Sequence, residues 1–445
     1  MHPLVIGTAL LQAPLAADIA AVLQDPDVDV GRASVYVKAL GGEAVYALSP
    51  DTPLIPASTI KIVTAAYAFH VLGPDYSPTT LAWRDGDAVF LAGGGDPGLQ
   101  IEELEALAAA VGVTPADKVY FDDQFLGPER YAPTWPQGDI RMGYGQPISA
   151  LTVNGGRAEV WVEGDRAYFK PRNFGLTIVP RLSRGGGGVR VDHDSRAWAV
   201  GVTGGAKSGP IRVDTVVLPD PGLCAARVFA PQAQRAPNLV PPPPGGPPIS
   251  LVRARTIETL CAKMLTDSNN TYAETILRVT GKLATGSGAW SDAAQGAEAF
   301  LRSRELAPGT FRVADGSGLS RANRMSARSL ASLLEQTLLS DNGAKFLRCL
   351  ASPGLGTLRS RLAGCRVWAK TGTLTGASSL AGMVECTDSD GTVRRYVFAI
   401  IMNDYKSSAA SIRAVQDRIV KRLATPSANE AFLNRKEVST SAFGR

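Results

Sequence analysis

The sequence has few of the residues on which several common kinds of active site depend. Its 445 residues include only three histidines and five cysteines. None of these stands in an H-E-x-x-H or C-x-x-C spacing, so the sequence predicts no metal site and no cofactor. A serine-histidine-aspartate triad would need His70, inside an apolar helical segment, or His193, in a charged, glycine-flanked segment. Neither position favours a catalytic histidine.

A long apolar run and a strong net charge are also absent. The apolar run from Leu4 to Leu15 is too short to span a bilayer, so we expect at most peripheral association with a membrane. Residues 1–17 are either a signal segment or part of an ordinary buried helix from Leu11 to Leu23. The net charge of +5 is too dilute over this length to predict binding of nucleic acid.

Length and composition predict a globular chain with two or three domains. The chain is too long for one ordinary hydrophobic core, and 45% hydrophobic and 20% charged residues are typical of a globular protein. The proline-rich stretch 237–248 is the clearest boundary between domains. Cys349 and Cys365 either form a disulfide or are buried free thiols.

Hydrophobic periodicity and turn residues predict the order of the elements. Alternation on both sides of Gly41-Gly42 predicts a hairpin over 33–49. Short runs broken by glycines predict a β-rich stretch from Trp161 to Val217. The pattern further predicts helices over 223–234, 251–265, 271–279, 292–306, 327–340 and 409–423, and strands over 366–370, 379–386 and 396–403.

Ser58 and Lys61 stand at the start of an apolar segment that runs to Leu72 and stops at Gly73-Pro74. A segment that is apolar on nearly every side predicts a buried helix. A buried lysine on the same face as a serine three residues before it suits a hydroxyl nucleophile with an amine base. The alternative is an N-terminal capping serine followed by an ordinary lysine of the first turn.

Two further motifs favour the catalytic interpretation. Ser268 and Asn270 form S-x-N after a predicted helix, and Lys370 to Thr373 form K-T-G-T at the end of a predicted strand. The order S-x-x-K, S-x-N, K-T-G is typical of penicillin-binding proteins and serine β-lactamases. Each motif alone is weak, but the three together are unexpected by chance.

The chain resembles the peptidase S13 family, the class C penicillin-binding D-alanyl-D-alanine carboxypeptidases and endopeptidases. Besides the three motifs, five blocks carry the resemblance: Asp96-Pro97-x-Leu99, Trp135-Pro136, Pro147 to Asn154, Asp315 to Arg321, and Gly356-Thr357-Leu358. The resemblance implies an α/β (α+β) fold with a discontinuous penicillin-binding/β-lactamase-like transpeptidase domain, an antiparallel sheet flanked by helices. It implies that residues 18–79 and 249–425 form this catalytic domain, residues 80–248 inserted β-rich domains with a second small insert at about 158–217, and residues 426–445 a loose tail.

The resemblance also implies a role for each motif residue. Ser58 forms an acyl-enzyme, with Lys61 as its base, and Ser268 passes the proton to the leaving amine between Lys61 and Lys370. The substrate amide is bound by Asn270. The terminal carboxylate is held by Lys370, Thr371 and Thr373, and Gly372 lines the same backbone edge without side-chain bulk. The backbone amides of Ser58 and Thr373 form the oxyanion hole, and Asp139 and Arg321 hold the stem-peptide side chain.

The function implied is a serine D-alanyl-D-alanine carboxypeptidase or endopeptidase that acts on peptidoglycan stem peptides and is acylated by β-lactams. Such an enzyme is exported and works in the periplasm or on the extracellular face of the cell envelope. Two alternatives stay open: a serine β-lactamase-like hydrolase, which needs fast deacylation, and a catalytically weak module that binds peptidoglycan.

Overall fold

The computed structural model describes residues 5–426 except 185–187, 207–208 and 254, so most of the predicted tail lies outside the described residues. The chain divides into two compact units, each built from several segments. Unit 1 contains Met1–Tyr67, Ala262–Asn269 and Ala297–Arg445. Unit 2 contains Ala68–Cys261 and Asn270–Gly296.

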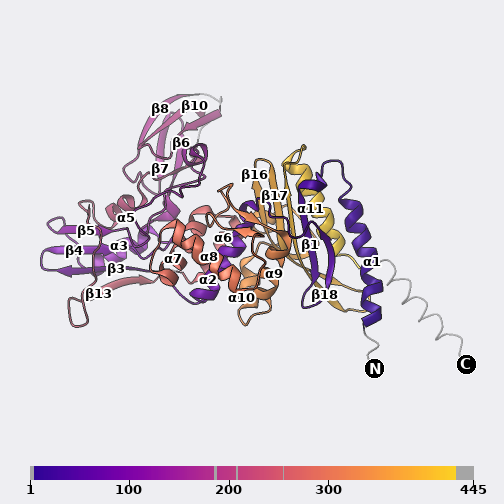
Figure 1. Cartoon of the computed structure of the whole chain (residues 1–445). Coiled ribbons are helices and arrows are strands. Elements are labelled where there is room, and N and C mark those ends of the chain that lie inside the picture. The colour runs from indigo at the N-terminus through magenta and orange to yellow at the C-terminus, as the bar shows by residue number, and fades with distance from the viewer. Residues whose placement is uncertain (1–4, 185–187, 207–208, 254, 427–445) are drawn as a thin grey trace, which may run out of the picture. The chain divides into compact units, whose positions relative to one another are not determined.

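Unit 1 is organised around a five-stranded antiparallel sheet in which the two ends of the chain lie side by side (Figure 1). The first strand pairs along its whole length with the last one, from Ala33 opposite Met402 to Ala39 opposite Tyr396. The predicted hairpin over 33–49 and the three C-terminal strands are confirmed. In sheet order the strands are β16 (Arg366–Leu374), β17 (Ala377–Thr387), β18 (Val393–Asn403), β1 (Ala33–Ala39) and β2 (Ala44–Leu48).

Helices from both ends of the chain cover one face of this sheet. α1 (Val5–Val22) and α11 (Ala409–Leu423) pack together against it, and Leu15, Ile19 and Leu23 are buried in the shared core. The sequence left open whether the N-terminal region is a signal segment or part of a buried helix from Leu11 to Leu23, and the structure shows a buried helix there. Unit 1 also contains η1 (Val30–Arg32), η2 (Ala57–Ile60), α9 (Ala327–Leu338), α10 (Gly343–Cys349), η4 (Gly356–Leu358), β14 (Phe311–Arg312) and β15 (Arg324–Met325).

Unit 2 contains a mixed five-stranded sheet with the order β12 (Gln234–Arg235), β5 (Lys118–Asp122), β4 (Ala88–Ala92), β3 (Thr79–Asp85) and β13 (Ile249–Arg253). The last of these strands corrects the predicted helix over 251–265. Residues 249–253 pair with the edge of β3, and helix α6 (Ile257–Asp267) begins only after them. Pairing with a free sheet edge satisfies the backbone there and overrides a weak helical pattern.

The predicted β-rich stretch is confirmed and forms two three-stranded sheets. One has the order β8 (Thr177–Arg184), β10 (Ala199–Ala206), β9 (Gly188–Asp192), and the other β11 (Ile211–Val217), β6 (Arg157–Glu163), β7 (Arg166–Lys170). Both share one hydrophobic cluster with the mixed sheet, since Leu91, Val160 and Val200 belong to the same core. α3 (Ile101–Ala110) and α5 (Pro221–Phe229) pack in this core. The helix predicted over 223–234 corresponds to α5, which begins two residues earlier and ends five residues earlier than predicted.

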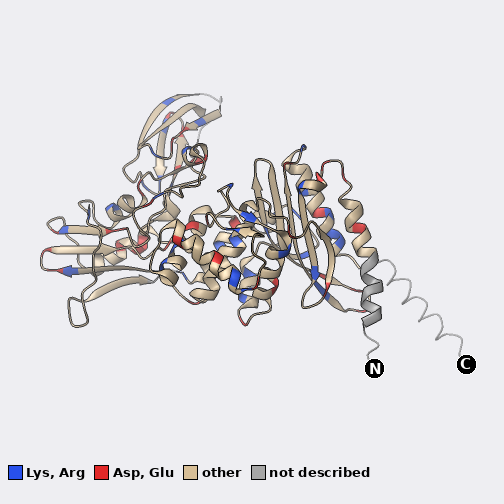
Figure 2. Ribbon diagram, viewed as in Figure 1, with Lys and Arg blue, Asp and Glu red and all other residues tan. Residues whose placement is uncertain are grey.

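Helix α7 (Asn270–Thr285) lies in unit 2, and α8 (Trp290–Ser303) continues from unit 2 into unit 1. The five cysteines all lie within the described residues and form no disulfide, so Cys349 and Cys365 are not joined, and Cys349 is buried. Within the described residues, no helix combines the length and apolar character that a membrane crossing requires. Figure 2 shows basic and acidic residues interspersed along the elements of both units.

Candidate active site

Ser58 lies in a tight turn that the chain forms under local strain. The 3-10 helix η2 (Ala57–Ile60) leads directly into α2 (Lys61–Val71), which is buried along most of its length, as predicted. The residue before the serine, Ala57, has a φ of 47°, a left-handed conformation that is uncommon for alanine. Such strain persists only where the surroundings impose it, and it is frequent at functional sites.

Two glycines allow the neighbouring backbone to approach this turn. A Cβ on Gly318 would lie 2.0 Å from the carbonyl oxygen of Ala57 and 2.9 Å from the amide nitrogen of Ser58. A Cβ on Gly372 would lie 3.0 Å from the same amide nitrogen. Ser58 is therefore enclosed between the 315–320 loop and strand β16, at distances that only glycine permits.

Lys61 is completely buried, and its ammonium nitrogen lies next to the serine hydroxyl. The Nζ atom is 3.0 Å from Ser58 Oγ and 2.5 Å from the carbonyl oxygen of Ser317. One turn later, Thr64 donates a hydrogen bond to the carbonyl oxygen of Gly316. The loop that carries Ser317 thus fixes both the first turn of α2 and the position of the amine.

Asp315 is the buried centre of this loop. Its carboxylate accepts hydrogen bonds from the amides of Gly318 and Ser320, at 2.8 and 2.6 Å, and from the side chain of Asn323 at 2.6 Å. From the sequence, this segment could be identified only by its resemblance to a family block, and no role was predicted for the Ser317 carbonyl. A backbone oxygen leaves no residue-type signal that could have revealed that role.

Lys370 is the second completely buried amine of unit 1. Its Nζ atom lies 2.9 Å from Ser268 Oγ and 2.5 Å from the carbonyl oxygen of Thr371. Burial, and then the positive charge of Lys61, lower the pKa of Lys370 well below its usual value. Each of the two lysines therefore contacts one of the two predicted serines, and the two amines are close enough to influence each other electrostatically.

The strand that carries the K-T-G-T segment is longer than the predicted strand over 366–370. β16 continues to Leu374 and pairs with β17 over its whole length, so Lys370 to Thr373 lie inside it, near its end. The amide of Ala369 donates away from β17, to Ala351. Because backbone groups alternate in direction along a strand, the amides of Thr371 and Thr373 also point to this open edge.

Ser268 has a φ of 60° in the link between α6 and α7, a second left-handed non-glycine residue at the predicted site. Asn270 is the first residue of α7 and belongs to unit 2, where its side chain donates to the carbonyl oxygen of Tyr144 at 3.1 Å. Asp139 lies in α4 (Gln137–Arg141) of unit 2, and its backbone carbonyl oxygen accepts hydrogen bonds from the amides of Tyr144 at 3.0 Å and Gly145 at 3.2 Å. Arg321 lies in unit 1 and donates to the carbonyl oxygen of Thr375 at 2.9 Å.

Comparison with known families decides the assignment. The profile of the D-Ala-D-Ala carboxypeptidase 3 (S13) family matches residues 15–169 and 242–426, which is most of the chain. The chain belongs to this family. Membership confirms the resemblance inferred from the motifs and makes the chain a serine-type D-Ala-D-Ala carboxypeptidase. The unmatched residues between the two segments, 170–241, include strands β8 to β11 of the β-rich insert.

Similar proteins cover nearly the whole chain. A D-alanyl-D-alanine carboxypeptidase of Actinomadura sp. (strain R39) is 30% identical over 94% of this chain and 86% of its own length. A carboxypeptidase of Mycobacterium tuberculosis is 28% identical over 88% of this chain and 80% of its own. The crystal structure of penicillin binding protein 4 from Haemophilus influenzae has the same fold, with a TM-score of 0.72 and 20% identity over 91% of this chain and 98% of that one. A second structure of that protein, with a TM-score of 0.69 and 19% identity over the same shares, holds a β-lactam.

Proposed function

We propose that Ser58 is the nucleophile of this S13 carboxypeptidase and that Lys61 is the base that activates it. The observation that carries the proposal is the 3.0 Å contact between Lys61 Nζ and Ser58 Oγ, made by an amine with no exposed surface. A buried amine can accept a proton because burial and a nearby cation both disfavour its charged form. The dipole at the start of α2 adds to the stabilisation of the negative charge that develops at the serine.

The reaction then has two stages. Ser58 Oγ attacks the carbonyl carbon of the bond between the two D-alanines while its proton moves to Lys61, and the bond to the leaving nitrogen breaks as that nitrogen receives a proton. Ser268, held by Lys370, relays this proton from Lys61 to the leaving nitrogen. Water then cleaves the ester and releases the shortened peptide and the free serine.

The backbone supplies the oxyanion donors. The amide of Ser58 lies beside Gly372, and the amide of Thr373 points to the open edge of β16. Two amides aimed at the developing oxyanion are each worth about 3 kcal/mol of transition-state stabilisation. Lys370 and the threonine hydroxyls of β16 hold the terminal carboxylate, Asn270 binds the substrate amide, and Asp139 and Arg321 hold the side chain of the stem peptide.

The substrates are peptidoglycan stem peptides, and β-lactams acylate the same serine. The family membership and the β-lactam bound to a protein of the same fold support this part of the proposal. Because its polymer substrate lies outside the cytoplasm, the enzyme works in the periplasm or on the outer face of the cell envelope.

The test is the intact mass of the protein after incubation with benzylpenicillin, followed by mapping of the modified peptide. We expect one penicilloyl adduct on the peptide that contains Ser58, release of D-alanine from a D-Ala-D-Ala stem-peptide mimic, and neither in Ser58→Ala. The matched control is Ser360→Ala, an exposed serine of unit 1, which should keep both. An adduct on another residue would overturn the assignment, and an adduct that turns over within seconds would favour a β-lactamase.

A further inference from the structure

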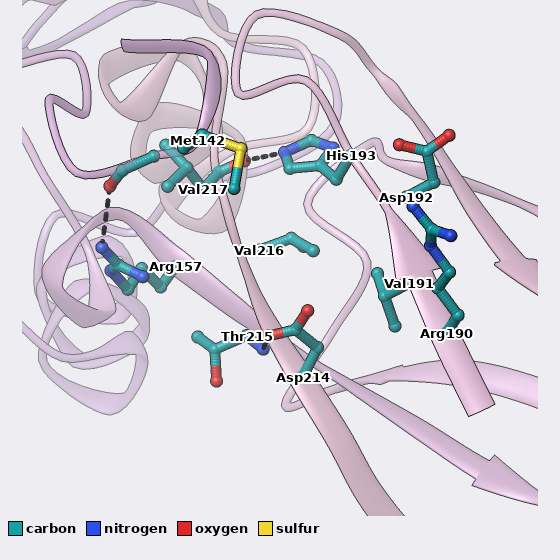
Figure 3. Close-up of a pocket in the computed structure, with 11 residues that line it drawn as sticks. Met142, Arg157, Arg190, Val191, Asp192, His193, Asp214, Thr215, Val216 and Val217 are labelled. Atoms are coloured by element: carbon teal, nitrogen blue, oxygen red, sulfur yellow. Dashed lines mark hydrogen bonds between the residues drawn. The ribbon is translucent and has the colours of Figure 1, made fainter. Parts of the chain in front are cut away.

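A cavity outside the catalytic motifs lies within unit 2, between strands β9 and β11 and the start of β6 (Figure 3). It has a volume of about 260 Å³, enough for a small organic molecule. Valines from β9 and β11 line its interior, and charged side chains surround them. None of its residues is part of the S-x-x-K, S-x-N or K-T-G motifs.

Charged side chains of both signs line this cavity. Arg157 and Arg190 supply two positive charges, and Asp192 and Asp214 supply two negative ones. Within the described part of the chain, no salt bridge connects any of the four. Arg157 instead donates to the side chain of Gln146 at 2.9 Å and to the carbonyl oxygen of Gly143 at 3.1 Å. A pocket that keeps opposite charges apart is complementary to a ligand that also carries both charges.

His193 closes one wall of the cavity. One ring nitrogen, Nε2, lies 3.1 Å from the carbonyl oxygen of Val217, and this contact ties β11 to the residue that follows β9 (Figure 3). The other nitrogen, Nδ1, has almost no solvent-accessible surface, so the ring shapes the cavity and does not itself bind a ligand.

We propose that this cavity binds a small zwitterionic amino acid with a short aliphatic side chain. Its carboxylate pairs with Arg190, its ammonium with Asp214, and its side chain lies on Val191 and Val216. Free D-alanine, the product that the proposed reaction releases, has this chemistry, as does any other small amino acid. The site itself does not depend on the proposed role of Ser58.

The cavity also adjoins the segment that receives Asn270. Gly143, which accepts the hydrogen bond from Arg157, lines the cavity, and the next residue, Tyr144, accepts the hydrogen bond from the Asn270 side chain. An occupied cavity would therefore act on the same short segment that positions a predicted substrate-binding residue.

The test is titration of the full chain with D-alanine, with binding measured by calorimetry or NMR. We expect saturable binding with a dissociation constant of about 1 mM. Arg190→Gln or Asp214→Asn should raise this constant at least tenfold. Acetate and methylamine, which each carry one of the two charges, should bind far more weakly. Glycine and L-alanine show whether the site selects the product or accepts small amino acids in general, and either result supports the proposal.

Controls separate this site from the active site. Ser58→Ala should retain the binding that Arg190→Gln loses, and Arg190→Gln should keep normal penicillin acylation because it lies outside the motifs. Arg166→Gln, an exposed arginine on β7, is the matched control and should bind D-alanine normally. Binding that survives Arg190→Gln and Asp214→Asn, or no saturable binding at all, would overturn the proposal.

Discussion

The ammonium nitrogen of Lys61 lies 2.5 Å from the carbonyl oxygen of Ser317, on a loop more than two hundred and fifty residues further along the chain. The same nitrogen contacts Ser58 Oγ at 3.0 Å. A lysine side chain has four flexible methylene groups and would lose much rotamer freedom in reaching a single position unaided. The Ser317 carbonyl fixes the amine beside the hydroxyl before substrate arrives, which is the preorganisation that proton transfer requires.

Replacing Lys61 by methionine should slow acylation by benzylpenicillin by about 10²- to 10⁴-fold, the usual contribution of a positioned base. Methionine keeps much of the volume of the lysine, so the fold should survive. The measurement is the rate of adduct formation by mass spectrometry. Lys406→Met, at an exposed position, should acylate at the normal rate. Near-normal kinetics in Lys61→Met would mean that another group is the base.

The lowered pKa of Lys370 predicts how stability depends on pH. Burial and the charge of Lys61 disfavour the protonated amine in the folded state, so the unfolded chain binds more protons between the folded pKa and the usual value of 10.5. The free energy of unfolding therefore rises with pH through this window, by at most about 1.4 kcal/mol per pH unit from this group.

Lys370→Met should lose this contribution. Compared with the natural chain, the variant should be relatively more stable at the acidic end of the window, and the difference should shrink as the pH approaches 10.5. Chemical denaturation at several pH values measures both curves. Two parallel curves would show that the Lys370 amine does not titrate with a depressed pKa.

The sequence allowed the motif residues to be predicted because each contributes a recognisable side chain to a recognisable element. The α2 segment is apolar on nearly every side, and Leu380 to Val384 of β17 and Tyr396 to Met402 of β18 are apolar runs, so their burial follows from composition. The pairing of β1 with β18 could be expected only from the family resemblance, since it joins residues more than three hundred and fifty positions apart.

The parts that could not be predicted depend on the backbone and on tertiary pairing. The extension of β16 through Lys370 to Thr373 results from pairing with β17, which a hydroxyl-rich, glycine-containing segment does not indicate by itself. The same holds for β13, where pairing with β3 replaced an expected helix. The Ser317 carbonyl and the left-handed Ala57 and Ser268 are likewise invisible to residue-type patterns.

Asp315→Asn should destabilise the chain by about 1–3 kcal/mol and also slow acylation. An amide has one acceptor oxygen where the carboxylate has two, so the buried N–H groups of Gly318, Ser320 and Asn323 cannot all remain paired. The loop would then release the Ser317 carbonyl from Lys61. Thermal unfolding and penicillin acylation measure the two effects, and Asp341→Asn, on the surface, should change neither. If Asp315→Asn is destabilised but keeps full acylation activity, the loop that contains Asp315 does not position the Lys61 amine.

Gly372→Ala tests how closely β16 must approach the nucleophile. The added Cβ would lie 2.2 Å from Ser379 Oγ, 2.7 Å from the carbonyl oxygen of Pro56 and 3.0 Å from the amide nitrogen of Ser58. The Ser379 hydroxyl already donates to the Pro56 carbonyl at 2.5 Å, and both atoms are held by the turn, so neither can move freely. The strand must therefore shift away from Ser58 and carry the Thr373 amide with it.

Displacing one oxyanion donor should reduce the acylation rate about 10²- to 10³-fold, while overpacking should cost about 1–3 kcal/mol of stability. Adduct formation and chemical denaturation measure these separately. Gly31→Ala is the matched control, since its Cβ would meet only Asp29 Oδ1 at 3.4 Å, an ordinary contact, and it should leave both quantities unchanged. Wild-type acylation by Gly372→Ala would contradict the placement of the oxyanion hole, because the bulk of a methyl group cannot be accommodated there without moving the amide of Thr373 or Ser58.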